Sequence, residues 1–221
     1  MPIQIDIDQA RFNMIEQQIR TWQVLDQTVL DLLLEIHRED FVPDDYRQLA
    51  FADMNIPLAN AQVMMTPKLE ARLLQSLAIL ENDKVLEIGT GSSYLTALLA
   101  KCANHVESVD IFADFSHEAK IKLDAYQINN VDLRTGDALS DQQTQKKYDV
   151  IVVTGSLPTL NPILQEQLAP GGRMFVIIGD SPVMEARLIT RVGAGEYDTE
   201  SLFETDLPPL LGIDKNSSFN F

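Results

Sequence analysis

The residues best suited to chemistry lie in a glycine-rich turn, the stretch VLEIGTGSSY from Val85 to Tyr94. Gly89 and Gly91 follow an apolar run and precede a helical stretch, which is where a doubly wound sheet binds nucleotide-like ligands. Glycines there permit a tight turn and let the backbone come close to a ligand. A G-x-G pair also occurs in ordinary turns, so the pair alone indicates only a candidate binding site.

Two details of this turn bear on the kind of ligand. The dinucleotide fingerprint G-x-G-x-x-G needs a third small residue so that helix and strand can pack closely, but Tyr94 is large at that position. Glu87, at the end of the apolar run, would repel a pyrophosphate and suits a cationic amino group. Both details argue against NAD and favour S-adenosylmethionine, whose amino acid portion carries an ammonium group.

Two further carboxylates follow the next two apolar runs. Asp110 lies nineteen residues after Gly91, where a carboxylate can accept both hydroxyls of a ribose. Asp137, in the stretch TGDAL, could face an adenine ring. Each carboxylate by itself is more often a solvated surface group. Three carboxylates in this order after three successive strands favour a cofactor site.

Short apolar runs and helical stretches alternate from Asn82 onward and form the framework for these residues. Strands are predicted at 84–88, 105–110, 131–134, 148–154 and 173–178, and helices at 95–102, 116–126 and 162–168. This order is typical of an α/β fold with a mostly parallel sheet flanked by helices. The continuous apolar run from Val150 to Val153 is typical of a strand buried on both faces. Later strands at 187–192 and 201–207 are expected to be antiparallel edge strands.

The chain divides into three predicted parts. Residues 1–80 are expected to be a helical extension that covers the active site, residues 81–213 the cofactor-binding α/β domain, and residues 214–221 a flexible tail. Within the extension, Thr66 followed by Pro67 is a helix-start signal.

Near the N-terminus, Asp6 and Asp8 alternate with Ile5 and Ile7, which suggests an extended strand.

Composition excludes several classes of function. The 221 residues carry a formal net charge of −16, and no Lys/Arg cluster is present, so nucleic acid and anionic membranes are poor candidate partners. No stretch approaches the ~20 apolar residues of a membrane span, and the N-terminus lacks the pattern of a signal peptide. A cytoplasmic protein is therefore expected. The composition does not indicate an oligomeric state.

Other reactive residue types show no catalytic or metal-binding pattern. The single cysteine, Cys102, excludes an intrachain disulfide and a multi-cysteine zinc site. His37, His105 and His117 have no spacing that places two of them on one helical face, so structural or surface roles are expected. Ser156 lacks the G-x-S-x-G frame of a hydrolase nucleophile. No metal site is expected.

Between about Arg11 and Gly212 the chain resembles the protein-L-isoaspartate O-methyltransferases. The matching stretches are MIEQQIR at 14–20, FVP at 41–43, LAFAD at 49–53, IPL at 56–58, the glycine-rich turn at 85–94, YDVIVVTG at 148–155 and QLAPGGR at 167–173. The glycine-rich turn and the YDVIVVTG strand are shared by many methyltransferases, whereas the N-terminal run is specific to this family.

The resemblance implies a Rossmann-like class I methyltransferase fold and an activity. The family uses S-adenosylmethionine to methylate the α-carboxyl of isoaspartyl residues in damaged proteins, so the expected partner is a protein or peptide. The nucleophile is already ionised at neutral pH, and no general base is required. The cofactor-binding residues implied are Glu87, Gly89, Thr90, Gly91, Ser92, Asp110, Ile111, Asp137, Ala138 and Thr154.

The segment expected to bind the methyl acceptor departs from the family pattern. The family reads G-Q-T-x-S-x-P where residues 61–67 read AQVMMTP, so Val63 and Met65 replace two hydroxyl residues. Met65 and Thr66 match the active-site segment, although Thr66 is also the expected helix cap. Three hypotheses follow: an isoaspartyl methyltransferase, a methyltransferase with another acceptor, or a protein that binds the cofactor without catalysis.

Overall fold

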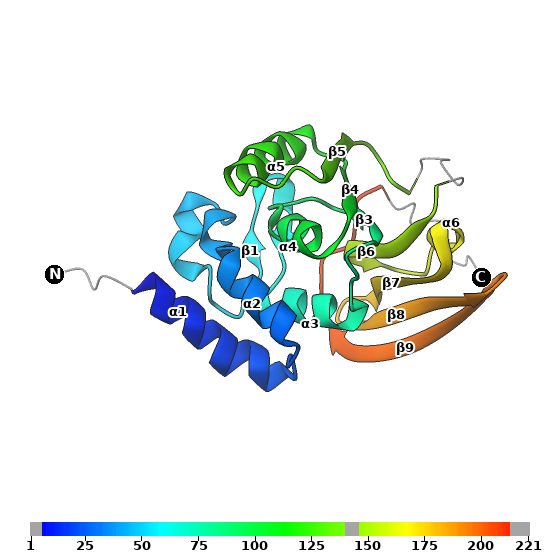
Figure 1. Cartoon of the computed structure of the whole chain (residues 1–221), viewed down its shortest axis with the longest axis horizontal. Helices are drawn as coiled ribbons and strands as arrows, with labels where there is room; N and C mark the ends of the chain where they lie inside the picture. The colour runs from blue at the N-terminus through cyan, green and yellow to red at the C-terminus, as the bar shows by residue number, and fades with distance from the viewer. Residues whose placement is uncertain (1–5, 140–145, 213–221) are drawn as a thin grey trace.

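A seven-stranded sheet with the order β5-β4-β3-β6-β7-β8-β9 forms the centre of the computed structural model, which describes residues 6–139 and 146–212 (Figure 1). The strands are β3 (Lys84–Ile88), β4 (His105–Asp110), β5 (Val131–Thr135), β6 (Tyr148–Leu157), β7 (Leu168–Asp180), β8 (Val183–Gly193) and β9 (Glu196–Thr205). Strands β3 to β7 pair in parallel, and β8 and β9 are antiparallel. The predicted α/β fold is therefore confirmed. The two last strands are antiparallel as predicted, but of these two only β9 is an edge strand, because β8 pairs with both β7 and β9.

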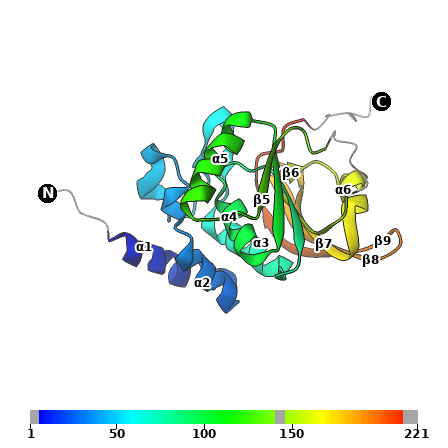
Figure 2. The same cartoon turned by 45° about the horizontal axis from the view of Figure 1, so that its top comes forward.

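Helices cover both faces of this sheet. One face carries α3 (Pro67–Leu77), α4 (Tyr94–Cys102) and α5 (Ala113–Ala125), and the other carries α6 (Pro162–Gln167), as Figure 2 shows. Between these layers the side chains from Val150 to Val153 on β6 are all fully buried. The prediction that this strand is buried on both faces is correct, and the reason is its central position in the sheet.

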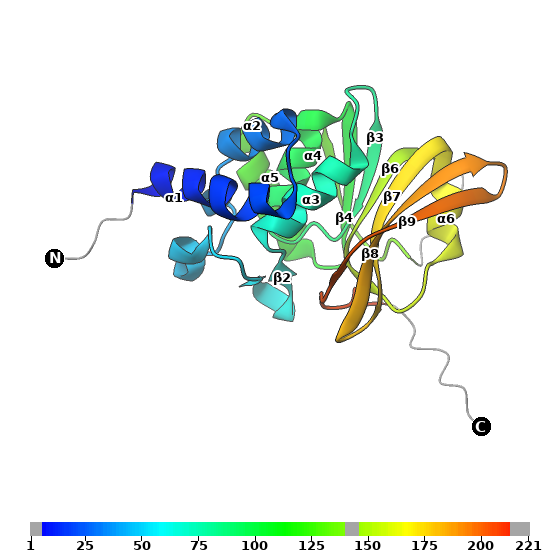
Figure 3. The same cartoon turned by 90° about the horizontal axis from the view of Figure 1, so that it is seen from below.

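The N-terminal helices pack on the same face as α3, α4 and α5 (Figure 3). Helix α1 (Ile7–Met14) continues through a π-helical turn (Ile15–Ile19) and a 3₁₀ turn (Arg20–Trp22), and α2 (Gln27–Glu35) follows. Buried residues of these helices, such as Ile19 and Leu33, belong to one hydrophobic core with residues of the sheet, such as Val106 and Phe175. Among the described residues no helix has the length and apolar character needed to cross a membrane.

The expected strand around Asp6 and Asp8 is wrong. Asp6 is the N-cap of α1, and its carboxylate accepts a hydrogen bond from the Gln9 amide at 3.1 Å. An aspartate at this position satisfies an otherwise unpaired amide of the first helical turn, which outweighs the alternating pattern. Ile5 lies outside the described residues, as does the predicted tail at 214–221.

The connection between α2 and α3 contains short elements only. These are 3₁₀ turns at Arg38–Asp40, Asp44–Leu49 and Ala59–Ala61, and the two-stranded antiparallel pair β1 (Ile56–Pro57) and β2 (Val63–Met64). The predicted cap at Thr66 is confirmed, because its side chain accepts a hydrogen bond from the Leu69 amide at 3.4 Å and Pro67 opens α3. The last residues of this connection, from Gln62 to Met65, line the pockets of the candidate site.

Candidate functional site

Two adjoining pockets open at the carboxyl ends of β3, β4 and β6. The larger pocket has about 690 Å³ of empty space and the smaller pocket about 300 Å³. Four residues line both pockets: Val63, Gly89, Gly91 and Thr154. This edge of an open α/β sheet is where such folds bind ligands, because the loops that follow parallel strands converge there.

All ten residues implied as cofactor ligands line these pockets. Asp110, Ile111, Asp137 and Ala138 line the larger one, and Glu87, Thr90 and Ser92 line the smaller one. Gly89, Gly91 and Thr154 face both. The tertiary structure thus brings together residues that the sequence spreads over four successive strand ends.

The glycine-rich turn needs glycine at its first position. Gly89 has φ of +98°, and a Cβ added there would lie 2.1 Å from Thr154 Oγ1. Thr154 Oγ1 donates to the carbonyl oxygens of Ile88 and Gly89, at 2.8 and 2.7 Å. The end of β6 is therefore fixed against the turn, and no residue with a Cβ fits between them.

Glu87 is the least solvated carboxyl group of the site, with no exposed surface. Its Oε2 accepts hydrogen bonds from Thr96 Oγ1 and Ser108 Oγ, both at 2.6 Å. Its Oε1 is buried and has no hydrogen-bond partner in the described part of the chain. Since Glu87 lines the smaller pocket, a donor bound there would satisfy this oxygen.

Burial raises the pKa of Glu87 to about 8. The hydrogen bonds from Ser108 and Thr96 lower it, and the nearby carboxyl groups of Asp110 and Glu70 raise it. A carboxyl group in this situation is stabilised in its ionised form by any cation that enters the pocket. Perturbed carboxyl groups of this kind are typical of binding sites.

Asp110 and Asp137 face the larger pocket from the ends of β4 and β5. Asp110 Oδ2 accepts a hydrogen bond from the Gly91 amide at 3.0 Å, and Oδ1 accepts one from the Phe112 amide at 2.9 Å. Burial raises the pKa of Asp110 above its ordinary value. Asp137 Oδ1 accepts from the Leu139 amide at 2.9 Å. These amides hold both carboxylates in place beside the pocket.

The two residues of the candidate acceptor segment are placed differently. Met65 is buried and lines the smaller pocket. Its carbonyl oxygen accepts a hydrogen bond from Arg38 Nη2 at 2.6 Å. Thr66 lines neither pocket and serves as the cap of α3. Val63 lines both pockets. The family pattern has a hydroxyl residue at this position.

The chain after β9 is a part of the site that was not predicted from the sequence. Residues 207–211 form one wall of the larger pocket. Ser156, on β6, holds this wall: its Oγ donates to the Leu207 carbonyl at 2.8 Å, its amide donates to the Pro208 carbonyl, and its carbonyl accepts from the Leu210 amide, both at 3.0 Å. The sequence signal for this wall was the apolar, proline-containing run LPPLL that follows the last strand.

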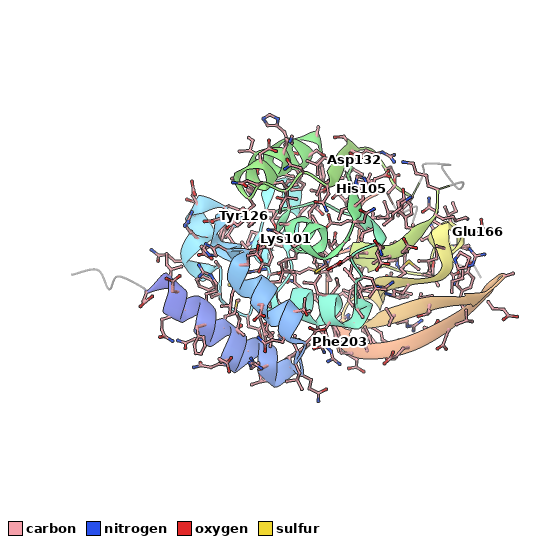
Figure 4. The ribbon with its side chains drawn as sticks, viewed as in Figure 1. Lys101, His105, Tyr126, Asp132, Glu166 and Phe203 are labelled. Atoms are coloured by element: carbon pink, nitrogen blue, oxygen red, sulfur yellow. The ribbon has the colours of Figure 1, made fainter. Side chains whose placement is uncertain are left out.

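The histidines lie away from both pockets, as expected. His105 Nε2 lies 3.2 Å from Asp132 Oδ2 (Figure 4). His105 is the first residue of β4, so it lies at the end of the strand opposite to the pockets. His37 and His117 line neither pocket. Within residues 6–139 and 146–212 no group of three or more His, Cys, Asp or Glu side chains is placed to hold a metal ion.

Comparisons with known sequences point to one family over nearly the whole chain. The model of the family described as protein-L-isoaspartate(D-aspartate) O-methyltransferase matches residues 9–212. A protein-L-isoaspartate O-methyltransferase of Koribacter versatilis is 36% identical over 206 residues, which are 93% of this chain and 91% of the relative. One of Rhodopseudomonas palustris is 34% identical over 202 residues, 91% of this chain and 93% of the relative.

Comparison with solved structures supports the fold. A Plasmodium falciparum protein described as a protein-L-isoaspartate O-methyltransferase, crystallised with S-adenosyl-L-homocysteine, superposes with a TM-score of 0.79. It is 17% identical and the match covers 94% of this chain and 99% of that chain. The Rossmann-like class I methyltransferase fold predicted from the sequence is thereby confirmed.

Proposed function

The chain belongs to the protein-L-isoaspartate(D-aspartate) O-methyltransferase family, and we propose that its two adjoining pockets together hold S-adenosylmethionine. The protein is an S-adenosylmethionine-dependent methyltransferase that acts on the carboxyl group of isoaspartyl residues in proteins. We place the adenosine part of the cofactor in the larger pocket and its amino acid part in the smaller one. The family match favours this function over a protein that only binds the cofactor.

Glu87 carries the proposal for the cofactor site. Glu87 lines the smaller pocket, and its buried Oε1 has no hydrogen-bond partner among the described residues. An ammonium group can both donate a hydrogen bond to this oxygen and neutralise the carboxylate. Asp110, Asp137 and Ala138 line the larger pocket, and we assign the ribose hydroxyls to Asp110 and the adenine to Asp137 and Ala138. Thr90, Ser92 and Ile111 complete the proposed contact set.

The chemistry asks little of the chain beyond binding and alignment. When bound, the cofactor supplies a methyl group activated by a sulfonium. The acceptor carboxylate is ionised at neutral pH, so no side chain has to remove a proton. The absence of histidine from the lining of both pockets, within the described residues, suits this reaction. The chain must orient the acceptor and exclude water.

We assign the acceptor side to the segment 62–66. Gln62 and Val63 line the larger pocket, and Met64 and Met65 line the smaller one. Through this segment, residues 1–80 would cover the site formed by the α/β domain of residues 81–213. The thioether of Met65 cannot donate a hydrogen bond, so at this position the acceptor would meet apolar surface rather than a hydroxyl.

Two measurements on the full chain test this function. Calorimetric titration with S-adenosylmethionine should show binding, and incubation with methyl-labelled cofactor and an isoaspartyl peptide should give a base-labile label on the peptide. The same peptide with a normal aspartate is the control and should stay unlabelled. Binding without transfer to the isoaspartyl peptide would refute the acceptor assignment, and no binding at millimolar cofactor would refute the cofactor site.

A further inference from the structure

A buried ion pair lies directly behind the smaller pocket, between two residues that the proposed chemistry does not use. Arg38 is 1% exposed and Glu70 is 2% exposed. Arg38 Nη1 donates to Glu70 Oε2. Arg38 comes from the 3₁₀ turn Arg38–Asp40, whereas Glu70 comes from the first turn of α3 and lines the smaller pocket.

The guanidinium of Arg38 also holds two backbone carbonyls. Its Nε donates to the Ala50 carbonyl at 2.9 Å, and its Nη2 donates to the Met65 carbonyl at 2.6 Å. Its carbon Cζ lies 5.1 Å from the centre of the Tyr94 ring, at the start of α4. One side chain therefore joins the connection after α2, the pocket wall at Met65, the start of α3 and the helix that follows the glycine-rich turn.

From these contacts we propose that Arg38, fixed by Glu70, is a positioning residue that sets the Met65 wall of the smaller pocket and thereby the affinity for the amino acid part of the cofactor. The inference rests on the proposed function, which places that part of the cofactor in the smaller pocket. Arginine suits the task because its planar fork presents donors at fixed angles to three acceptors. A lysine ammonium keeps the charge but cannot reach the same three acceptors together.

Arg38 contacts two residues that line the smaller pocket but not the larger one. Met65 and Glu70 line the smaller pocket only. The larger pocket shares four lining residues with the smaller one, and much of its remaining lining comes from the ends of β4 and β5 and from residues 207–211. A change at Arg38 should therefore discriminate between ligands that fill both pockets and ligands that fill only the larger one.

The test compares two ligands in calorimetric titrations of the full chain. S-adenosylhomocysteine has the amino acid part, and 5′-methylthioadenosine lacks it. For Arg38→Lys we expect the dissociation constant of S-adenosylhomocysteine to rise about tenfold, as for the loss of one well-placed hydrogen bond. The dissociation constant of 5′-methylthioadenosine should change by less than about twofold. Arg47→Lys is the matched control, because Arg47 pairs with the exposed Asp40, and it should change neither value.

Because Arg38→Lys leaves buried acceptors without their donors, a second variant is needed in case it does not fold. The double variant Arg38→Met with Glu70→Met removes both charges together, which cores tolerate, and releases the Met65 carbonyl as well. It should show the same selective loss of S-adenosylhomocysteine affinity. Equal weakening of both ligands, or no change in either, would overturn the positioning role. A wild-type chain that binds neither ligand would instead refute the proposed function.

Discussion

Burial changes the pKa of Glu87, and this change affects how the smaller pocket binds a cationic ligand. Its carboxyl group is fully buried, and its pKa is raised to about 8. Without a ligand the group is therefore mostly protonated at neutral pH. An ammonium in the smaller pocket would favour the ionised form, so binding would release the proton. Two other acids interact with this group, Asp110 and Glu70, and burial raises the pKa of Glu70 to about 7.

We predict that affinity for S-adenosylmethionine rises with pH between about 6 and 7.5, by at most tenfold per pH unit. Below pH 8 Glu87 must lose its proton to pair with the ammonium, and this requirement weakens as pH rises. The range ends below the ordinary pKa of an α-amino group, about 7.7–8.0, where the ligand itself loses its charge. In Glu87→Gln the pH dependence should flatten and the affinity at pH 7.5 should fall by about ten- to a hundredfold. Calorimetry at a series of pH values measures both.

Glu35→Gln is the matched control for this substitution, because Glu35 forms an exposed pair with Lys101. An unchanged pH slope in Glu87→Gln would contradict the assignment. Stability of the ligand-free chain gives an independent readout. At pH values between the ordinary glutamate pKa of 4.5 and the raised pKa of about 8, the folded Glu87 holds a proton that the unfolded chain has released. The stability contribution of this group is thus present at low pH and lost as pH rises to 8, and the loss should be absent in Glu87→Gln.

The end of strand β6 contacts two other parts of the site. Its central residues are buried in the sheet, while its end carries Thr154 against the glycine-rich turn and Ser156 against the chain after β9. The pairing of β6 with β7 shifts register between Val152 and Ser156. This irregularity accompanies a second partner, since Ser156 also forms a parallel bridge with Pro209. The strand end therefore holds two walls of the larger pocket.

Ser156→Ala tests the importance of that second contact. Loss of the hydroxyl leaves the Leu207 carbonyl without its side-chain donor, while the two backbone hydrogen bonds of residue 156 remain. We expect about fivefold weaker binding of 5′-methylthioadenosine, the equivalent of about 1 kcal/mol, and faster amide exchange at Leu210. Calorimetry and hydrogen-exchange mass spectrometry measure the two effects. Ser116→Ala, which removes an exposed hydroxyl contact to Thr135, should leave both unchanged. Full protection of Leu210 in Ser156→Ala would argue against this role.

At the scale of the whole molecule, helices from the first part of the chain and one face of the sheet share a core. Ile19 and Leu33 pack in the same cluster as Val106 and Phe175. Trp22 adds an edge contact to Phe203 on β9, with ring centres 5.7 Å apart. The N-terminal helices and the sheet are therefore joined by a continuous packed interior, which limits how far they can move apart.

The net charge of the molecule, −16, leads to a prediction about partners. Binding to a nucleic acid depends on Lys and Arg side chains that neutralise phosphates and release their counterions, and the acidic sequence offers few of them. We predict no binding of a labelled RNA hairpin or DNA duplex at 0.15 M salt in fluorescence anisotropy, up to micromolar protein. A basic RNA-binding domain should serve as the positive control. Saturable binding that weakens steeply with salt would contradict the prediction.

The sequence by itself determined the order of strands and helices from Asn82 onward, the glycine-rich turn and the helix cap at Thr66, because these features depend on neighbouring residues and on local periodicity. It also indicated the carboxylates at the strand ends, since parallel strands bring their ends to one edge. Only the tertiary structure decided the contact of Arg38 with Glu70 and Met65 and the return of residues 207–211 to Ser156. These contacts join residues far apart in the chain, and their energies depend on burial and on donor geometry, which local patterns do not encode.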